Sequence, residues 1–174
     1  VDVKFAGLVR KLQVYKVDAV LGMTIQQRFV AQYLMGTATM ELEKFQIPEK
    51  LDSSSTYRLI YCLLGRLQLG VFFGYYEFAL EMAEKLAPLA EFENSHAVRS
   101  LGIYFTSLTY AILARKRNKK SNAAKARRRC NQLISLCNTK GENSRHRCML
   151  LEAQLLSLSG KKPSQVQSSF DDAI

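Results

Sequence analysis

Residues 74–89, GYYEFALEMAEKLAPL, consist of a glycine followed by the pattern of an amphipathic helix. Apolar residues recur at steps of three or four on one face, at Tyr76, Ala79, Leu80, Ala83 and Leu86. This spacing predicts a helix that ends near Pro88. The preceding segment, 57–73, has the same spacing, so Gly74 separates two predicted helices. Two helices joined by so short a turn are expected to pack antiparallel.

The same two-helix pattern returns twice along the chain. The predicted pairs cover 57–90, 97–138 and 143–174, and they begin near 57, 98 and 144. A period of about 40 residues is typical of helical solenoids. A further helix pair is predicted in 1–47, followed by a linker over 48–56 that contains Pro48 and a serine cluster. The expected fold is therefore all-α, an antiparallel helix-pair solenoid of about eight helices.

The first of these pairs resembles the tetratricopeptide repeat. The resemblance rests on Gly74, Tyr76, Ala79, Ala83 and Leu86, where small residues let the two helices of a pair approach each other. In the last pair the same pattern is kept by Ala153, Gly160, Val166, Phe170 and Ala173. The middle pair departs from it, because the segment RKRNKKSNAAK, residues 115–125, stands where a tight turn is expected.

A second resemblance is to the helical-repeat region of very large signalling proteins, in which a kinase-like domain, an AAA-type ATPase and often a GAF sensor with a histidine kinase or a cyclase are fused. It rests on Asn143, His146, Leu150, Leu151 and Ala153. The resemblance implies a cytoplasmic, non-catalytic interaction or regulatory segment, whose partner is a protein, a peptide or a neighbouring domain of the same chain. It also implies that any ATPase or kinase activity belongs to other domains.

The positive charge of the chain is concentrated in one segment. Nine basic residues and no acidic one occur from 115 to 129: Arg115, Lys116, Arg117, Lys119, Lys120, Lys125, Arg127, Arg128 and Arg129. The other residues carry 16 basic against 15 acidic side chains. Such a segment is typical of a solvated surface or of a surface that docks on an acidic domain. The alternative is binding of RNA or another phosphate-rich surface, although the segment has no aromatic residue for base stacking.

Polar and aromatic residues on the first helices of the pairs are candidates for a concave binding face. They are Tyr57, Arg58, Tyr61, Arg66 and Tyr104. Helical repeats commonly bind their partners on this side.

No pattern of residues in the sequence predicts a catalytic site, a cofactor or a metal. The four cysteines, Cys62, Cys130, Cys137 and Cys148, form no C-x-x-C pair and occupy apolar helical positions, which favours buried, reduced thiols. His96 and His146 both lie beside helix-capping residues. The longest apolar run, LQLGVFFGYY at 67–76, is too short to span a membrane, so no transmembrane segment is expected.

The last predicted helix carries an apolar stripe that continues to the final residue. Val166, Phe170, Ala173 and Ile174 form this stripe, and no capping residue or closing glycine follows it. We therefore expect the 174 residues to be a segment of a longer polypeptide.

Overall fold

The computed structural model describes residues 53–89, 95–140 and 144–173, together with residues 7, 28, 30–32 and 34–36. Six helices lie in the described part of 53–173: α3 (Ser53–Phe72), α4 (Tyr76–Leu86), α5 (His96–Arg117), α6 (Lys120–Lys140), α7 (Arg145–Ser157) and α8 (Pro163–Asp171). No strand occurs among the described residues, so the predicted all-α class is confirmed.

Most of the predicted helix pair at 1–47 lies outside the described residues. One correction is possible at Gly36, because the spacing of Phe29, Tyr33, Gly36 and Met40 predicts a single helix through this position. Gly36 has a φ of 67°, a left-handed value that an α-helix excludes. The helical residues before it, 30–32 and 34, therefore end in a turn at 35–36, and the predicted helix does not continue unbroken through Gly36.

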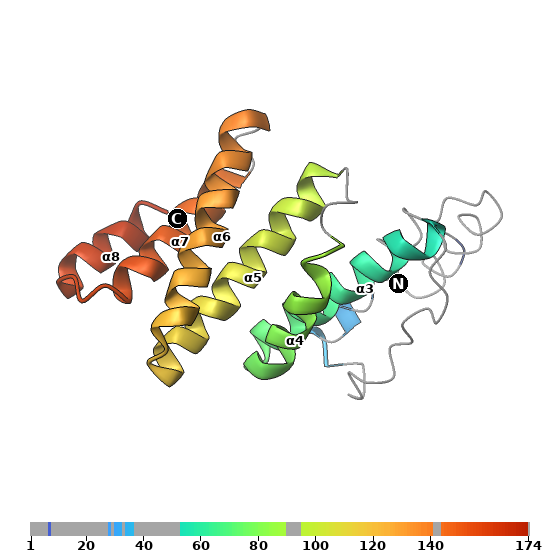
Figure 1. The fold of residues 1–174 in the computed structure, drawn as a ribbon, viewed down its shortest axis with the longest axis horizontal. Helices are drawn as coiled ribbons and strands as arrows, with labels where there is room; N and C mark the ends of the chain where they lie inside the picture. Colours follow the sequence, from blue (N-terminus) through green and yellow to red (C-terminus); the bar gives the residue numbers. More distant parts are fainter. Residues whose placement is uncertain are drawn as a thin grey trace.

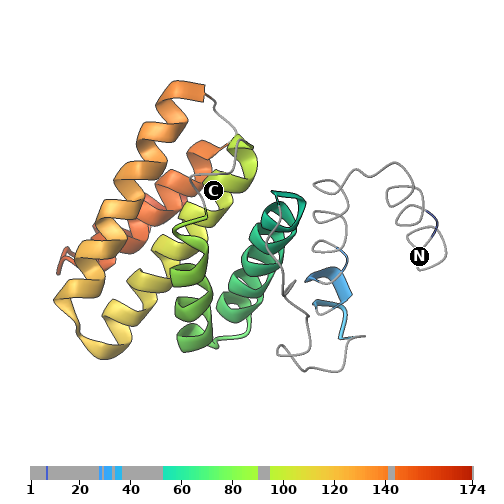
Figure 2. The same ribbon diagram turned by 45° about the vertical axis from the view of Figure 1, so that its right-hand side comes forward.

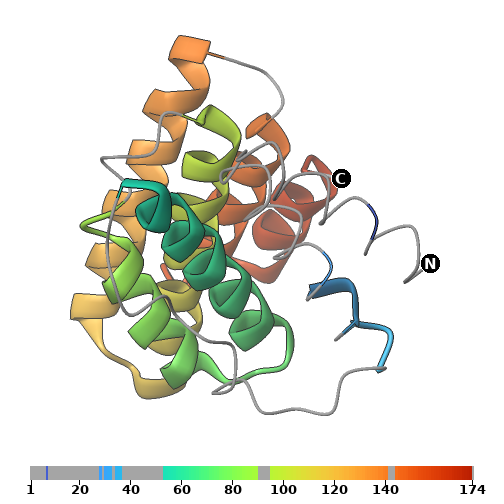
Figure 3. The same ribbon diagram turned by 90° about the vertical axis from the view of Figure 1, so that its right-hand side faces the viewer.

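The helices follow one another in chain order along the long axis of the molecule, from α3 to α8 (Figure 1). Each helix packs on the next, and α5 also contacts α3 and α7. The two helices of the α5–α6 pair run side by side in opposite directions (Figure 2). Seen from the α3 end, α3 and α4 lie in front of the later helices (Figure 3).

The apolar core is divided into three clusters. The first joins α3, α4 and α5 and is built from residues such as Ile60, Leu64, Leu67, Met82 and Leu86. The second joins α5, α6 and α7 through Ile103, Cys130, Leu133, Cys148 and Leu151. A third and smaller cluster, Tyr110, Ala111 and Ala126, lies between α5 and α6. Because α5 contributes to all three clusters, it is the helix that joins the earlier helices to the later ones.

Small residues bring the paired helices together. A Cβ atom added to Gly70 of α3 would lie 3.0 Å from the Cβ of Ala79 on α4, so the two helices touch at this point. Between α5 and α6, the hydroxyl of the fully buried Ser107 donates a hydrogen bond to the carbonyl oxygen of Ala126, at 2.9 Å. Ala79 therefore has the close-packing role that its position predicts, and Gly70 is its counterpart on the other helix.

Each pair has a short turn that contains a residue in the left-handed region. Gly74 and Gly160 have φ values of 78° and 69° in the α3–α4 and α7–α8 turns. The middle pair is joined by Asn118 and Lys119 alone, and Asn118 has a φ of 50°. The predicted long connector at 115–125 is thus wrong: its residues end α5 and begin α6. Lysine, arginine and alanine favour helices, and asparagine tolerates the left-handed conformation better than most residues.

Several predicted boundaries move by a few residues. Helix α3 begins at Ser53, so the last four residues of the predicted linker 48–56 are helical. Helix α5 is capped by Ser95, whose hydroxyl accepts a hydrogen bond from the backbone N–H of Val98 at 3.5 Å. Ser144 occupies the N-cap position of α7 without a side-chain capping bond. Helix α8 ends at Asp171, and Ala173 is buried beyond it in a turn rather than on the helix.

Helix α5 is the one described helix that is long and apolar enough to cross a membrane by length and composition. Most of its apolar window, 61%, is buried inside the fold, where α5 contacts α3, α4, α6 and α7. Its central position in the core accounts for its composition. The longest apolar run in the sequence, residues 67–76, lies earlier, mostly in α3 and the α3–α4 turn.

Candidate functional site

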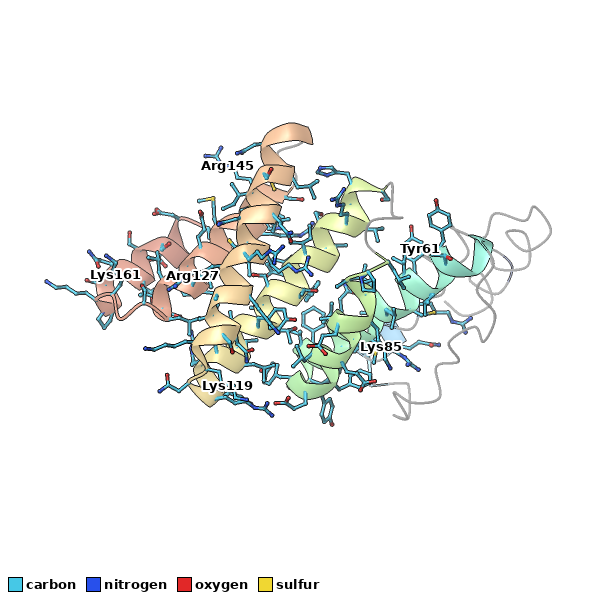
Figure 4. The ribbon with its side chains drawn as sticks, in the orientation of Figure 1. Tyr61, Lys85, Lys119, Arg127, Arg145 and Lys161 are labelled. Carbon is cyan, nitrogen blue, oxygen red and sulfur yellow. The ribbon has the colours of Figure 1, made fainter. Side chains whose placement is uncertain are left out.

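The nine basic residues of 115–129 lie on the end of α5, the α5–α6 turn and the first half of α6. All of them are exposed except Arg129, which is half-buried. Lys119, in the turn, lies at the lower end of the fold in Figure 4, whereas Arg127 lies farther along α6, on the side of α7 and α8. The basic residues therefore occupy several surfaces rather than one patch.

Aromatic residues of the α3–α4 pair lie beside the end of α5. The Nζ atom of Lys116 lies 4.4 Å from the centroid of the Tyr76 ring, a cation–π contact. Arg117 forms an ion pair with Glu77, with Nη2 at 2.5 Å from Oε1. Tyr75, next to Tyr76, is 54% exposed. We name this surface, formed by Tyr75, Tyr76, Lys116, Arg117 and Lys119, the aromatic–basic edge.

A second basic surface lies on the flank of α6 that faces Tyr110. A pocket of about 220 Å³ is lined by Tyr110, Lys125, Arg128, Arg129 and Gln132. Lys125 Nζ is 5.1 Å from the Tyr110 ring centroid, and Arg129 donates a 3.0 Å hydrogen bond to the side-chain oxygen of Gln132. Three cationic side chains and no acidic one line this pocket, so it can accept an anionic group.

Arg127 projects from the opposite flank of α6. It lines a groove of about 470 Å³ between α6, α7 and α8 together with Ile134, Glu152, Leu155 and Leu156. The remaining lining residues are Cys130, Asn131, Ser159 and Ser169. Because Glu152 lies in the same groove, this surface carries both signs of charge and differs from the pocket beside Tyr110.

The five candidates for a concave face do not form one open surface. Tyr61 and Arg66 are buried, with 6% and 5% of their surface exposed, and Tyr61 belongs to the first core cluster. Their burial contradicts the prediction that they are presented to a partner. Tyr57 is half-buried, and the side chain of Arg58 lies outside the described residues.

Tyr104 has an environment that differs from that of an exposed tyrosine. It is half-buried between the first and second clusters, and its ring packs edge-on against Phe105, with centroids 5.1 Å apart. Burial raises the pKa of Tyr104, and the nearby charge of Arg147 partly opposes this shift. Arg147 also donates a hydrogen bond to the hydroxyl of Ser100, at 3.3 Å, which joins α7 to α5.

The described residues contain no group of three or more histidine, cysteine, aspartate or glutamate side chains that could hold a metal ion. Ring nitrogen Nε2 of His96 lies 3.2 Å from the backbone oxygen of Leu136, a contact between α5 and α6, whereas His146 is exposed on α7. The absence of a catalytic, cofactor or metal site remains a prediction.

Three residues that the sequence did not suggest as part of a site contact the basic residues. In the sequence, Tyr76 is predicted only as part of the apolar stripe of its helix, and neither Tyr110 nor Gln132 is singled out. The two tyrosines meet lysines that lie 40 and 15 positions away along the chain, whereas Gln132 bonds Arg129 on its own helix. A single sequence has no pattern that reports such contacts.

No protein-family model, curated protein or solved structure matches the chain.

Proposed function

We propose that this chain is a tetratricopeptide-like helical-repeat segment that acts as a non-catalytic protein-interaction module. The observation that supports it best is the arrangement of the helices, which pack in chain order with α3–α5 and α5–α7 contacts between the first helices of successive pairs. In a solenoid each pair buries its apolar side on its neighbours and leaves the outer surfaces to bind partners. The division of the core into clusters agrees with such an architecture.

The packing within the pairs also supports a tetratricopeptide-like repeat. The close contact of Gly70 with Ala79, and the left-handed glycines at 74 and 160, correspond to the small residues and tight turns of that repeat. The middle pair also has a short turn, at Asn118. Its connection is therefore more like those of the other two pairs than its sequence predicts.

The aromatic–basic edge is the surface that we propose as the docking site. It combines exposed cationic side chains with aromatic rings, which suits an acidic protein segment that also carries apolar residues. The partner would be another protein or a neighbouring domain of the same polypeptide, in a cytoplasmic multidomain signalling protein with ATPase or sensor-kinase domains. Docking there would raise or lower the activity of those domains, while this segment itself catalyses no reaction.

A binding measurement with a defined probe tests the docking site. A fluorescent acidic peptide with interspersed phenylalanines is titrated with the chain and with the double variant Lys116→Glu/Lys119→Glu. We expect the variant to bind about tenfold more weakly, because two exposed charge reversals of roughly 0.7 kcal/mol each amount to one decade. Lys161→Glu, on the distant α7–α8 turn, is the matched control and should bind as the parent does. Equal affinity of all three chains, or no binding by the parent, contradicts the proposal.

Binding of RNA is the second candidate function, and one observation favours it. The basic segment lacks aromatic residues in sequence, but the fold places Tyr76 beside Lys116 and leaves Tyr75 exposed next to it. Aromatic rings among cations are what single-stranded RNA needs for base stacking.

An oligouridine probe distinguishes the two functions. Its affinity is measured at two salt concentrations for the chain and for the double variant Lys116→Glu/Lys119→Glu, which reverses the charges beside Tyr75 and Tyr76. Negligible binding that the variant does not alter eliminates the RNA function. Strong binding that weakens steeply with salt and is lost in the variant would replace the protein-interaction proposal.

A further inference from the structure

Two cysteine side chains meet between α6 and α7. The sulfur atoms of Cys137 and Cys148 are 3.1 Å apart, close enough for one thiol to donate a weak hydrogen bond to the other. Neither residue is in a disulfide in the structure, and the same holds for Cys62 and Cys130. The S–S bond of a disulfide is about 2.05 Å, so an approach of about 1 Å would bring the two sulfurs to bonding distance.

The packing of the second core cluster holds these two sulfurs in place. Cys137 lies four residues after Leu133 on α6, on the same side of that helix, and Cys148 lies three residues before Leu151 on α7. Leu133 and Leu151 are fully buried in this cluster. Because the helices are already fixed by these contacts, little further ordering is needed for the sulfurs to react with each other.

The two thiols differ in their access to solvent. Cys137 is half-buried, whereas only 6% of Cys148 is exposed. Burial raises the pKa of Cys148 to about 12, with smaller contributions from Cys137, Cys130 and Glu152, and burial raises the pKa of Cys130 to about 11. Because Cys137 is the more exposed of the two, a small oxidant reaches Cys137 before Cys148.

We propose that Cys137 and Cys148 form a redox modification site that a peroxide oxidises to an intramolecular disulfide. The Cys137 thiolate attacks one peroxide oxygen, the O–O bond breaks, and hydroxide leaves and takes up a proton to become water. Cys137 is then a sulfenic acid. Cys148 gives up its proton as its sulfur attacks the sulfur of Cys137, and the S–O bond breaks to release a second water. Two thiols and one hydrogen peroxide thus yield one disulfide and two waters.

This bond would join the end of the second helix pair to the start of the third. It would close the segment 137–148 and fix α6 against α7 while the oxidised state lasts, until a thiol reductant restores the two cysteines. The inference is independent of the proposed function, because it depends only on the geometry of the second cluster.

The test uses the 174-residue chain with equimolar hydrogen peroxide under non-denaturing conditions, followed by thiol counting and mass spectrometry of a non-reduced tryptic digest. Trypsin places Cys137 in the peptide 130–140 and Cys148 in the peptide 148–161. Because Cys130 shares the first of these peptides, Cys130→Ser is used alongside the parent to assign the bond.

We expect the parent to lose two thiols per chain, to remain a monomer on a non-reducing gel, and to yield the linked peptides, all reversed by dithiothreitol. Cys130→Ser and the control Cys62→Ser should give the same link, and Cys137→Ser should give none. The proposal is overturned if the parent keeps all four thiols or forms only intermolecular dimers. It also fails if Cys137 accumulates as sulfinic acid without a linked peptide, or if Cys137→Ser loses two thiols as readily as the parent. If a variant does not fold, fragmentation of the linked peptide from the parent in the mass spectrometer assigns the bond to Cys137 or to Cys130, and a bond to Cys130 overturns the proposal.

Discussion

Replacing Leu151 by alanine tests whether the helices depend on their neighbours or on one shared core. Leu151 lies on α7, has no exposed surface, and packs in the second cluster with Ile103, Leu133 and Cys148. Removing the larger part of a fully buried leucine side chain leaves a cavity that helices held on several sides cannot fill. The expected loss is about 3–4 kcal/mol of unfolding free energy. For a domain of this size that corresponds to a melting temperature lowered by roughly 6–16 °C.

Which helices lose hydrogen-exchange protection is more informative than how much unfolding free energy the variant loses. If each helix pair is stabilised mainly by its neighbours, Leu151→Ala should reduce amide hydrogen-exchange protection in α6, α7 and α8 and leave most of it in α3 and α4. Leu67→Ala is the matched variant, because Leu67 is equally buried but lies in the first cluster. It should show the reverse pattern, with α5 affected in both variants. Hydrogen exchange followed by mass spectrometry, resolved to single helices, makes the measurement.

A uniform loss would refute this reasoning. If both variants lower the protection of all six helices by the same factor, the described helices unfold as one unit, and the solenoid interpretation is wrong. A loss confined to α3 and α4 in the Leu151→Ala variant would contradict the assignment of the core clusters themselves.

Two smaller predictions concern the turns and the buried thiols. Gly74→Ala should lower the unfolding free energy, measured by urea titration, by about 1 kcal/mol, because alanine at a φ of 78° meets a steric penalty that glycine avoids. Asn118→Gly should not lower it, because glycine adopts the φ of 50° at that position without strain. The raised pKa of Cys130, about 11 because of burial, means that the folded state keeps a proton that the unfolded chain releases near pH 9. The stability that the protonated Cys130 thiol contributes is complete below pH 9 and is lost as the pH rises towards 11. The unfolding free energy measured over pH 8–11 should therefore fall less steeply in Cys130→Ala than in the parent.

The sequence predicts the helices well because helix formation here depends on local spacing. The three pairs at 57–90, 97–138 and 143–174 each correspond to two helices, and the glycines at 74 and 160 are in turns as expected. The error at 115–125 arises because a dense basic segment resembles a solvated connector in sequence. Long basic side chains are also good helix formers, and a single asparagine is enough to reverse the chain.

The surfaces are harder to predict because they depend on which helices meet. Periodicity places Tyr61 and Arg66 on α3 but does not determine how many sides of α3 other elements cover, and both residues are buried. The contact of Lys116 with Tyr76 joins residues 40 positions apart. Cys137 and Cys148 meet because α6 and α7 pack on each other. None of these contacts leaves a repeating pattern in the sequence.

The dependence of all three core clusters on α5 has a mechanical consequence. No substantial contact joins α3 or α4 to α7 or α8 among the described helices, so tension between the two ends of this part of the chain must pass through α5. The α3–α4 pair and the α7–α8 pair can therefore change their relative angle only by shifting against α5, whose buried residues belong to all three clusters. A force that pulled the two ends apart would load the contacts of α5, so this helix resists extension of the described part of the chain.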